Sequence, residues 1–208
     1  MNNIWVFGDS FSTNYAADTE IKVEQSWPEI VGQKLNKQVR NFAHPAVDNF
    51  FIYSNYVNQK PLIKSTDIVL LQWTMPTRKM FILDKNNTTH QQVIDDTDIV
   101  VTRNNVTYFR SGTRPGNWVP NLTTKDSGVK FFDEWYRNYF DITESETNLQ
   151  AYQQASKQPN TVHLHFSEIL DFIKQHKLYV SKDDHHPNVQ GHQQLANTIM
   201  EKINEQIL

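Results

Sequence analysis

A serine near one end of the sequence and a histidine near the other stand in contexts that suit nucleophilic chemistry. Ser10 follows a short apolar run in "IWVFGDSFS" (4–12), and "SKDDHHPNVQGH" (181–192) places Asp183 three residues before His186. A serine hydroxyl becomes a good nucleophile when a histidine accepts its proton and a carboxylate orients that histidine. The chain therefore contains the three groups that acyl transfer requires, provided that folding brings its two ends together.

The spacing within the second segment selects one histidine. His185 is the neighbour that could compete, but only His186 lies three residues after Asp183 and is followed by a proline. Three residues after Asp184 comes Pro187, so this spacing offers no second acid–histidine pair. We expect Pro187 to start the final helix and to hold the loop rigid, because the first turn of a helix tolerates its missing N–H.

The elements that must position these groups alternate along the chain. Continuous or alternating apolar runs predict strands at 4–7, 38–43, 67–73 and 161–166, and apolar stripes predict helices at 26–36, 49–59, 167–177 and 192–208. We expect Ser26 and Ser167 to cap two of these helices. Such alternation predicts an α/β fold with a mostly parallel sheet and helices on both faces. Ligands bind beyond the carboxyl ends of parallel strands, and Ser10 directly follows the first strand.

One segment interrupts this alternation. Residues 84–128 are rich in Asn, Thr and Asp, and "DIVVTRNNVTYFR" (98–110) is typical of a hairpin that turns near Asn104-Asn105. An aromatic-rich helix is expected at 131–140. We interpret the segment as an insertion packed on the sheet end, within a single domain that spans 1–208.

The sequence resembles the SGNH, or GDSL-type, serine hydrolase family. "GDSFS" (8–12) is similar to the family's first block, "DDHHP" (183–187) to its Asp-x-x-His-Pro block, and Gly191-His192 follows at the expected distance. The resemblance implies a three-layer, flavodoxin-like fold over the whole chain apart from the insertion. It also implies an esterase in which Ser10 is the nucleophile, His186 the general base and then acid, and Asp183 the orienting carboxylate. Neither a cofactor nor a metal is implied.

The middle blocks of the family differ in this chain. Asn41 is retained, but Ala46 stands where the family usually has a glycine whose N–H points into the oxyanion hole, and Thr74 stands in place of the family's asparagine. We expect the oxyanion to be bound by the backbone N–H groups of Ser10 and Ala46 and by the Thr74 hydroxyl. "WTMPTR" (73–78) resembles a Trp-Thr-x-x-x-Arg variant of phage-associated branches.

The expected substrate is a short acyl ester, with O-acetyl groups on carbohydrate first. This expectation rests on the family's range and on the aromatic insertion. Asn49, Arg78 and Trp118 are the candidates for substrate contact. Asn49 equally suits a helix cap, and Arg78 a pair with a surface carboxylate. Trp118, with part of the aromatic run at 131–139, could roof the site and stack on a sugar ring.

Two other hypotheses belong to different functional classes. A non-catalytic binding or structural module, for example in a phage tail, would retain the fold without turnover. A metal-dependent hydrolase could use the histidine-rich region 163–192, where His163 and His165 share one face of a strand. Against the metal site, a helix is expected directly after that strand, where ligands would have to lie.

Composition excludes further classes. The chain has 208 residues and no cysteine, which excludes disulfides and thiol nucleophiles. A net charge of −3 without a basic block argues against nucleic acid as a partner. No apolar stretch is long enough to span a membrane, and the N-terminus shows no secretion signal. We therefore expect a cytoplasmic protein without membrane partners, with association with a virion as the alternative setting.

Overall fold

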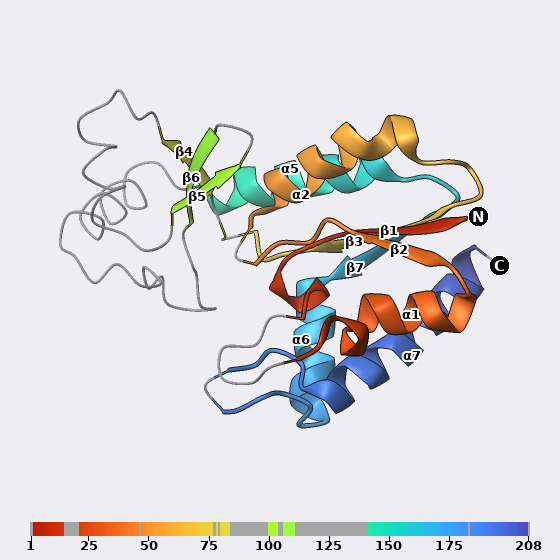
Figure 1. Ribbon diagram of the computed structural model, residues 1–208. Helices are drawn as coiled ribbons and strands as arrows, with labels where there is room; N and C mark the ends of the chain where they lie inside the picture. The colour runs from red at the N-terminus through yellow and green to blue at the C-terminus, as the bar shows by residue number, and fades with distance from the viewer. Residues whose placement is uncertain are drawn as a thin grey trace. The chain divides into compact units, whose positions relative to one another are not determined.

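A sheet of four parallel strands, in the order β2-β1-β3-β7, lies at the centre of the fold (Figure 1). The computed structural model describes residues 2–14, 21–45, 47–76, 78, 80–83, 100–103, 106–110, 141–182 and 184–207. The four strands are β1 (Asn3–Phe7), β2 (Gln38–Asn41), β3 (Ile68–Trp73) and β7 (Thr161–His165). All four predicted strands are confirmed.

Helices cover both faces of this sheet. Figure 1 shows α2 and α5 over one face and α1, α6 and α7 over the other. The helices are α1 (Trp27–Leu35), α2 (Asn49–Gln59), α5 (Ile142–Ser156), α6 (Phe166–Gln175) and α7 (Val189–Gln206), with short 3₁₀ turns η1 (Ser10–Ser12), η2 (Val23–Gln25) and η3 (Lys60–Leu62). The three-layer α/β architecture expected from the sequence is therefore confirmed.

The chain divides into two compact units, one formed by residues 1–75 with 150–208 and the other by residues 76–149. In the second unit, β4 (Met80–Leu83), β6 (Val106–Arg110) and β5 (Val100–Arg103) form an antiparallel sheet in that order. Arg103 pairs with Val106, which confirms the predicted hairpin around Asn104-Asn105. Most of the expected insertion and the aromatic helix at 131–140 lie outside the described residues. The single domain over 1–208 stays a prediction.

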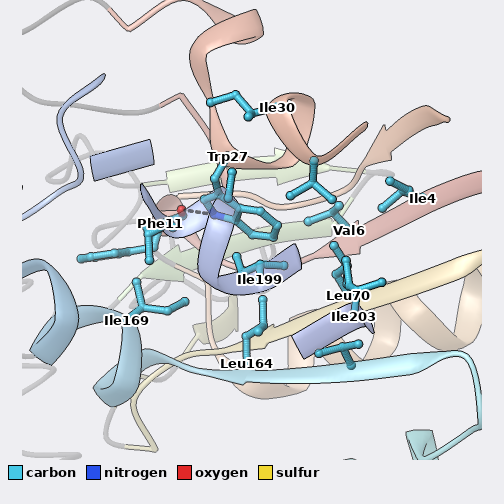
Figure 2. Close-up of a cluster of buried hydrophobic side chains, with 14 of the residues drawn as sticks. Ile4, Val6, Phe11, Trp27, Ile30, Leu70, Leu164, Ile169, Ile199 and Ile203 are labelled. Carbon is cyan, nitrogen blue, oxygen red and sulfur yellow. Dashed lines mark hydrogen bonds between the residues drawn. The ribbon is translucent and has the colours of Figure 1, made fainter. Parts of the chain in front are cut away.

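A cluster of buried apolar side chains lies between the sheet and helices α1, α6 and α7. Alternate residues of the strands, Ile4 and Val6 of β1 among them, point into it and are fully buried (Figure 2). Trp27, at the start of α1, is also fully buried and donates its indole N–H to the carbonyl of Phe11 at 2.8 Å. This bond, drawn as a dashed line in Figure 2, ties the first turn of α1 to the segment that carries Ser10.

The intervening strand residues face the opposite side of the sheet. Trp5 and Phe7 are buried there, and Phe7 meets Tyr56 of α2 edge to face, with ring centroids 5.8 Å apart. Because both faces of β1 and β3 are covered, these two strands need no polar alternation, and their sequences are nearly continuous apolar runs. Gln72 is the exception in β3, since this amide is fully buried. No helix in the described ranges is both long and apolar enough to cross a bilayer.

Two expectations about where helices start are wrong, and one helix was not expected. Helix α6 begins at Phe166 with His165 as its N-cap, so Ser167 lies inside the helix and does not cap it. Pro187 does not start the last helix: Asn188 caps α7, and its side-chain oxygen accepts the N–H of Gly191 at 2.8 Å. Helix α5 has no counterpart among the expected elements.

Candidate active site

Ser10 lies at the carboxyl end of β1, in the turn that follows the strand. Asp9 caps the short helix η1, because its carboxylate accepts the N–H of Phe11 at 2.9 Å. Ser10 is the first residue of η1 and is 5% exposed. The sequence thus ends a buried strand in a capped turn, which holds the serine at the sheet edge where ligands bind in α/β proteins.

The side chain of Gln72, in the neighbouring strand β3, forms hydrogen bonds with this turn. Its side-chain oxygen accepts the N–H of Asp9 at 2.9 Å and the hydroxyl of Ser12 at 3.0 Å. Its amide nitrogen donates to the carbonyl of Trp73 at 2.9 Å. A Cβ on Gly8 would lie 2.7 Å from the Ser12 hydroxyl and 2.8 Å from the Gln72 oxygen, so a larger residue would have to displace these two side chains.

His186 reaches Ser10 from a loop 176 residues later in the chain. Its Nε2 lies 2.8 Å from the Ser10 Oγ. The imidazole also packs against the ring of Phe11, with centroids 4.9 Å apart. The other candidate histidine, His185, meets Tyr179 edge to face at 5.4 Å. The fold therefore brings together the serine and the histidine that the sequence singled out.

The carboxylate that contacts His186 in the described part of the chain is Asp184. Its Oδ1 lies 2.5 Å from His186 Nδ1 and accepts the backbone N–H of His186 at 3.0 Å. Asp184 is buried, with its side chain 8% exposed. Asp183, the acid expected from the spacing, lies outside the described residues, so its role stays a prediction.

Short-range bonds close the loop that carries this pair. Ser181 donates its backbone N–H to the carbonyl of Asp184, while the Ser181 hydroxyl accepts the N–H of Asp184, both at 3.0 Å. Val180 donates to the carbonyl of His186 at 3.0 Å, and Tyr179 forms an isolated bridge with Pro187. The imidazole is thus mounted on a closed loop, and Pro187 stabilises that loop instead of the helix.

The structure describes two of the three expected oxyanion donors, the backbone N–H of Ser10 and the hydroxyl of Thr74. The backbone N–H of Ser10 donates to no described residue. Ala46 lies outside the described residues. The Thr74 hydroxyl donates to the Oδ2 of Asp9 at 2.7 Å, and a hydroxyl has only one proton to donate. An oxyanion role for Thr74 stays a prediction, and it requires the hydroxyl to turn away from Asp9.

Thr74→Val is expected to lower the free energy of unfolding by about 1–3 kcal/mol, because the fully buried Asp9 carboxylate loses a donor. Thr74→Ser keeps the hydroxyl and serves as the matched control. Urea denaturation of the two variants measures the difference. If Thr74→Val instead left stability unchanged and lowered only kcat, the hydroxyl would act on the oxyanion and not on Asp9.

Asn49 is neither the helix cap nor an unengaged side chain. Asp48 caps α2 by accepting the N–H of Phe51 at 2.8 Å. The Asn49 amide is buried and pairs with the backbone of Thr74, accepting its N–H at 2.9 Å and donating to its carbonyl at 3.1 Å. Its structural task is therefore to join the start of α2 to the end of β3, and a contact with substrate stays a prediction.

The other two candidates for substrate contact, Arg78 and Trp118, do not belong to the unit formed by residues 1–75 with 150–208. Arg78 is half-buried and belongs to the unit formed by residues 76–149, whereas Ser10 belongs to the other unit. Trp118 lies outside the described residues. A role in substrate binding stays a prediction for both.

The histidine-rich region does not assemble a metal site within the described ranges, where no three His, Asp or Glu side chains gather. His163 Nδ1 instead accepts the indole N–H of Trp73 at 2.9 Å. His192 Nδ1 accepts the backbone N–H of Trp27 at 3.2 Å. Two of the histidines therefore serve as acceptors inside the fold.

The Gly191-His192 pair of the resemblance has a structural explanation. A Cβ on Gly191 would lie 2.4 Å from the Leu178 carbonyl oxygen, so only glycine lets α7 start this close to the end of α6. His192 is fully buried. Burial, with a smaller contribution from His186, lowers the pKa of His192 to about 4.

Stability is expected to fall in mild acid because His192 stays neutral in the folded protein. The unfolded chain takes up a proton near pH 6.5, whereas the folded protein does so only near pH 4. The contribution of neutral His192 to the free energy of unfolding is thus fully present above pH 6.5 and is lost as the pH falls toward 4. About 2 kcal/mol of it is lost between pH 7 and pH 5.

His192→Asn tests this pH dependence, since its side-chain oxygen still offers an acceptor to Trp27 but does not titrate. Urea denaturation at pH 7 and pH 5 should show a smaller pH-dependent loss in the variant than in the parent. An equal loss in both proteins would show that His192 does not cause it.

Two polar residues of the site were not singled out from the sequence. Asp184 was passed over because the spacing argument considered only a separation of three residues. Gln72 left a detectable signal, since it is the one polar residue in the apolar run "IVLLQW" (68–73). A polar residue in the middle of a buried strand needs hydrogen-bond partners inside the fold.

Comparison with known proteins gives structural neighbours only. No protein-family model and no curated protein matches the chain. Solved structures that resemble it include GDSL/SGNH lipolytic proteins and carbohydrate esterases, at low sequence identity.

A G-D-S-L family lipolytic protein from Desulfitobacterium hafniense is 15% identical, with a TM-score of 0.45 over 97% of this chain and 99% of that one. One from Veillonella parvula is 15% identical, with a TM-score of 0.45 over 97% of both chains. A family two carbohydrate esterase from Clostridium thermocellum, solved with cellohexaose, is 12% identical, with a TM-score of 0.42 over 98% of this chain and 64% of that one.

Proposed function

We propose that this protein hydrolyses carboxylic esters through an acyl-enzyme formed on Ser10. The observation that carries the proposal is a continuous path of two hydrogen bonds, 2.8 Å from Ser10 Oγ to His186 Nε2 and 2.5 Å from Nδ1 to the Asp184 carboxylate. With the serine hydroxyl donating to Nε2, the ring proton lies on Nδ1 and donates to the acid. This is the tautomer that allows the imidazole to accept the serine proton.

The reaction then has two halves. Ser10 Oγ attacks the ester carbonyl carbon while its proton passes to His186 Nε2, and the tetrahedral intermediate collapses as His186 returns that proton to the departing alcohol. Water attacks the resulting acyl-serine, with His186 as the base, and releases the carboxylic acid. Asp184 stabilises the imidazolium in both halves, because its buried carboxylate lies next to Nδ1.

The oxyanion is assigned first to the backbone N–H of Ser10, which donates to no described residue. The N–H of Ala46 and the hydroxyl of Thr74 remain proposed partners. A backbone donor is rigid, so it binds the charge that develops on the carbonyl oxygen without reorganisation.

The proposed substrate is a short acyl ester, with O-acetylated carbohydrate as the first choice. Support comes from the resemblance of the motifs at 8–12 and 183–187 to the GDSL-type hydrolases.

Hydrolysis of p-nitrophenyl esters with acyl chains of increasing length tests the function, followed by acetate release from acetylated xylo-oligosaccharides. We expect turnover that is highest for acetate and falls as the acyl chain lengthens. A folded protein that hydrolyses none of these esters would contradict the proposal and favour the non-catalytic binding module. Activity that is highest on long chains would retain the chemistry but overturn the substrate class.

A further inference from the structure

A pocket outside the candidate active site runs along strand β7. It is open to solvent, has a volume of about 400 Å³ and is lined by neither Ser10 nor His186. Thr161, His163 and His165, which alternate along the strand, supply one wall. Glutamine side chains of α5, together with Lys157 just beyond that helix and Gln206 at the end of α7, supply most of the rest. All of these residues belong to the unit that contains the parallel sheet.

Two buried polar atoms of this wall lack a partner within the described part of the chain. They are the Oγ1 of Thr161 and the Nε2 of His163. Thr161 is only 7% exposed, so bulk water does not satisfy its hydroxyl. Both atoms belong to residues that line the pocket, although neighbouring atoms cover them. Because a buried polar group without a partner destabilises the folded state, a polar ligand that reaches these two atoms from the pocket would stabilise it.

The hydrogen-bonding character of the wall selects the ligand. Trp73 donates its indole N–H to His163 Nδ1, so the proton of the neutral imidazole lies on Nε2, which is a donor. Lys157 adds a positive charge, and no Asp or Glu lines the pocket. Burial first, and then the nearby His165 and Lys157, lower the pKa of His163 to about 4. The wall therefore offers N–H and O–H donors and one cation.

We propose that this pocket binds a small oxyanionic group, with the His163 Nε2–H, the Thr161 hydroxyl and the Lys157 ammonium as its donors. The group could belong to an inorganic anion such as sulfate or to the carboxylate of an acidic sugar, since both present several acceptor oxygens. The proposal stands apart from ester hydrolysis, because the pocket and the Ser10–His186 pair share no residue.

Calorimetric and NMR titrations of the intact protein test the site, at constant ionic strength maintained with NaCl. The probes are sodium sulfate, sodium glucuronate and, as the uncharged control, glucose. We expect saturable binding of sulfate, glucuronate or both, with shifts of the His163 imidazole resonances. If only sulfate saturates the site, the ligand is an inorganic anion. If only glucuronate does so, the ligand is an acidic sugar. No saturable binding of either anion, or equal binding of glucose, would overturn the proposal.

Lys157→Gln removes the cation, and Lys174→Gln, on the exposed side of α6, is the charge-matched control. We expect Lys157→Gln to weaken anion binding about fivefold, as for a solvent-exposed ion pair, and Lys174→Gln to leave it unchanged. Equal effects of the two variants would show general charge attraction and overturn the site.

Thr161→Val separates ligand binding from folding, because it replaces the partnerless hydroxyl with a methyl group of the same shape. We expect the melting temperature of the ligand-free variant to equal or exceed that of the parent, while anion binding weakens roughly tenfold. A lower melting temperature with unchanged anion binding would show that the hydroxyl serves the fold and not a ligand.

Discussion

Ser10→Ala is expected to abolish ester turnover while leaving the fold intact. The variant removes the atom that lies 2.8 Å from His186 Nε2. Loss of a triad nucleophile lowers kcat by roughly 10⁴- to 10⁶-fold in enzymes that act by this mechanism. Steady-state hydrolysis of p-nitrophenyl acetate measures the loss, and circular dichroism and the melting temperature report on the fold.

Ser12→Ala is the matched control, because both serines belong to η1. The hydroxyl of Ser12 donates to Gln72 and not to His186. Its removal should cost about 1 kcal/mol of stability and leave most of the turnover. Turnover by Ser10→Ala close to that of the parent would contradict the role of Ser10, whatever the control does.

The second large effect is expected for Asp184→Asn. An asparagine still fits the loop, but its neutral amide does not stabilise the imidazolium and favours the wrong histidine tautomer. In a Ser-His-Asp triad this change lowers kcat by about 10⁴-fold. Because Asp184 Oδ1 also accepts the backbone N–H of His186, the variant's melting temperature should be measured beside kcat. A loss of kcat much larger than any loss of folded protein would show a role in the chemistry.

Asp183→Asn is the comparison that decides between the two acids. The motif at 183–187 implies Asp183 as the orienting carboxylate, whereas the contact in the described structure is made by Asp184. We expect Asp183→Asn to retain most of the turnover. The opposite pattern, with Asp183→Asn inactive and Asp184→Asn active, would show that the motif spacing identifies the acid correctly and that the Asp184 contact only holds the loop.

The central sheet could be predicted because its strands carry a strong local signal. Ile4–Phe7 and Ile68–Trp73 are apolar runs too short for helices, and each is buried on both faces. Helix α5 could not be predicted in the same way, since its sequence "ITESETNLQAYQQAS" is mostly polar. Its packing depends on contacts between residues distant in sequence. One is the stacking of Tyr152 on Tyr53, whose ring centroids lie 4.7 Å apart.

The candidate site was predictable to the extent that the strand ends determine it. Ser10 follows β1, and the parallel sheet places that end where a loop before the last helix can reach it, so its proximity to His186 follows from the topology. The identity of the acid does not follow, because the bridge between Tyr179 and Pro187 sets the course of the loop. The direction of the Thr74 hydroxyl depends likewise on Asp9, 65 residues away in sequence.

The most direct test of the central claim, that Ser10 is an activated nucleophile, is labelling of the purified protein with a fluorophosphonate probe. Mass spectrometry of the digested protein then identifies the modified residue. We predict one phosphonylated serine, Ser10, and no labelling of Ser10→Ala. A well-folded parent protein that takes up no label, or a label on a different residue, would contradict the account.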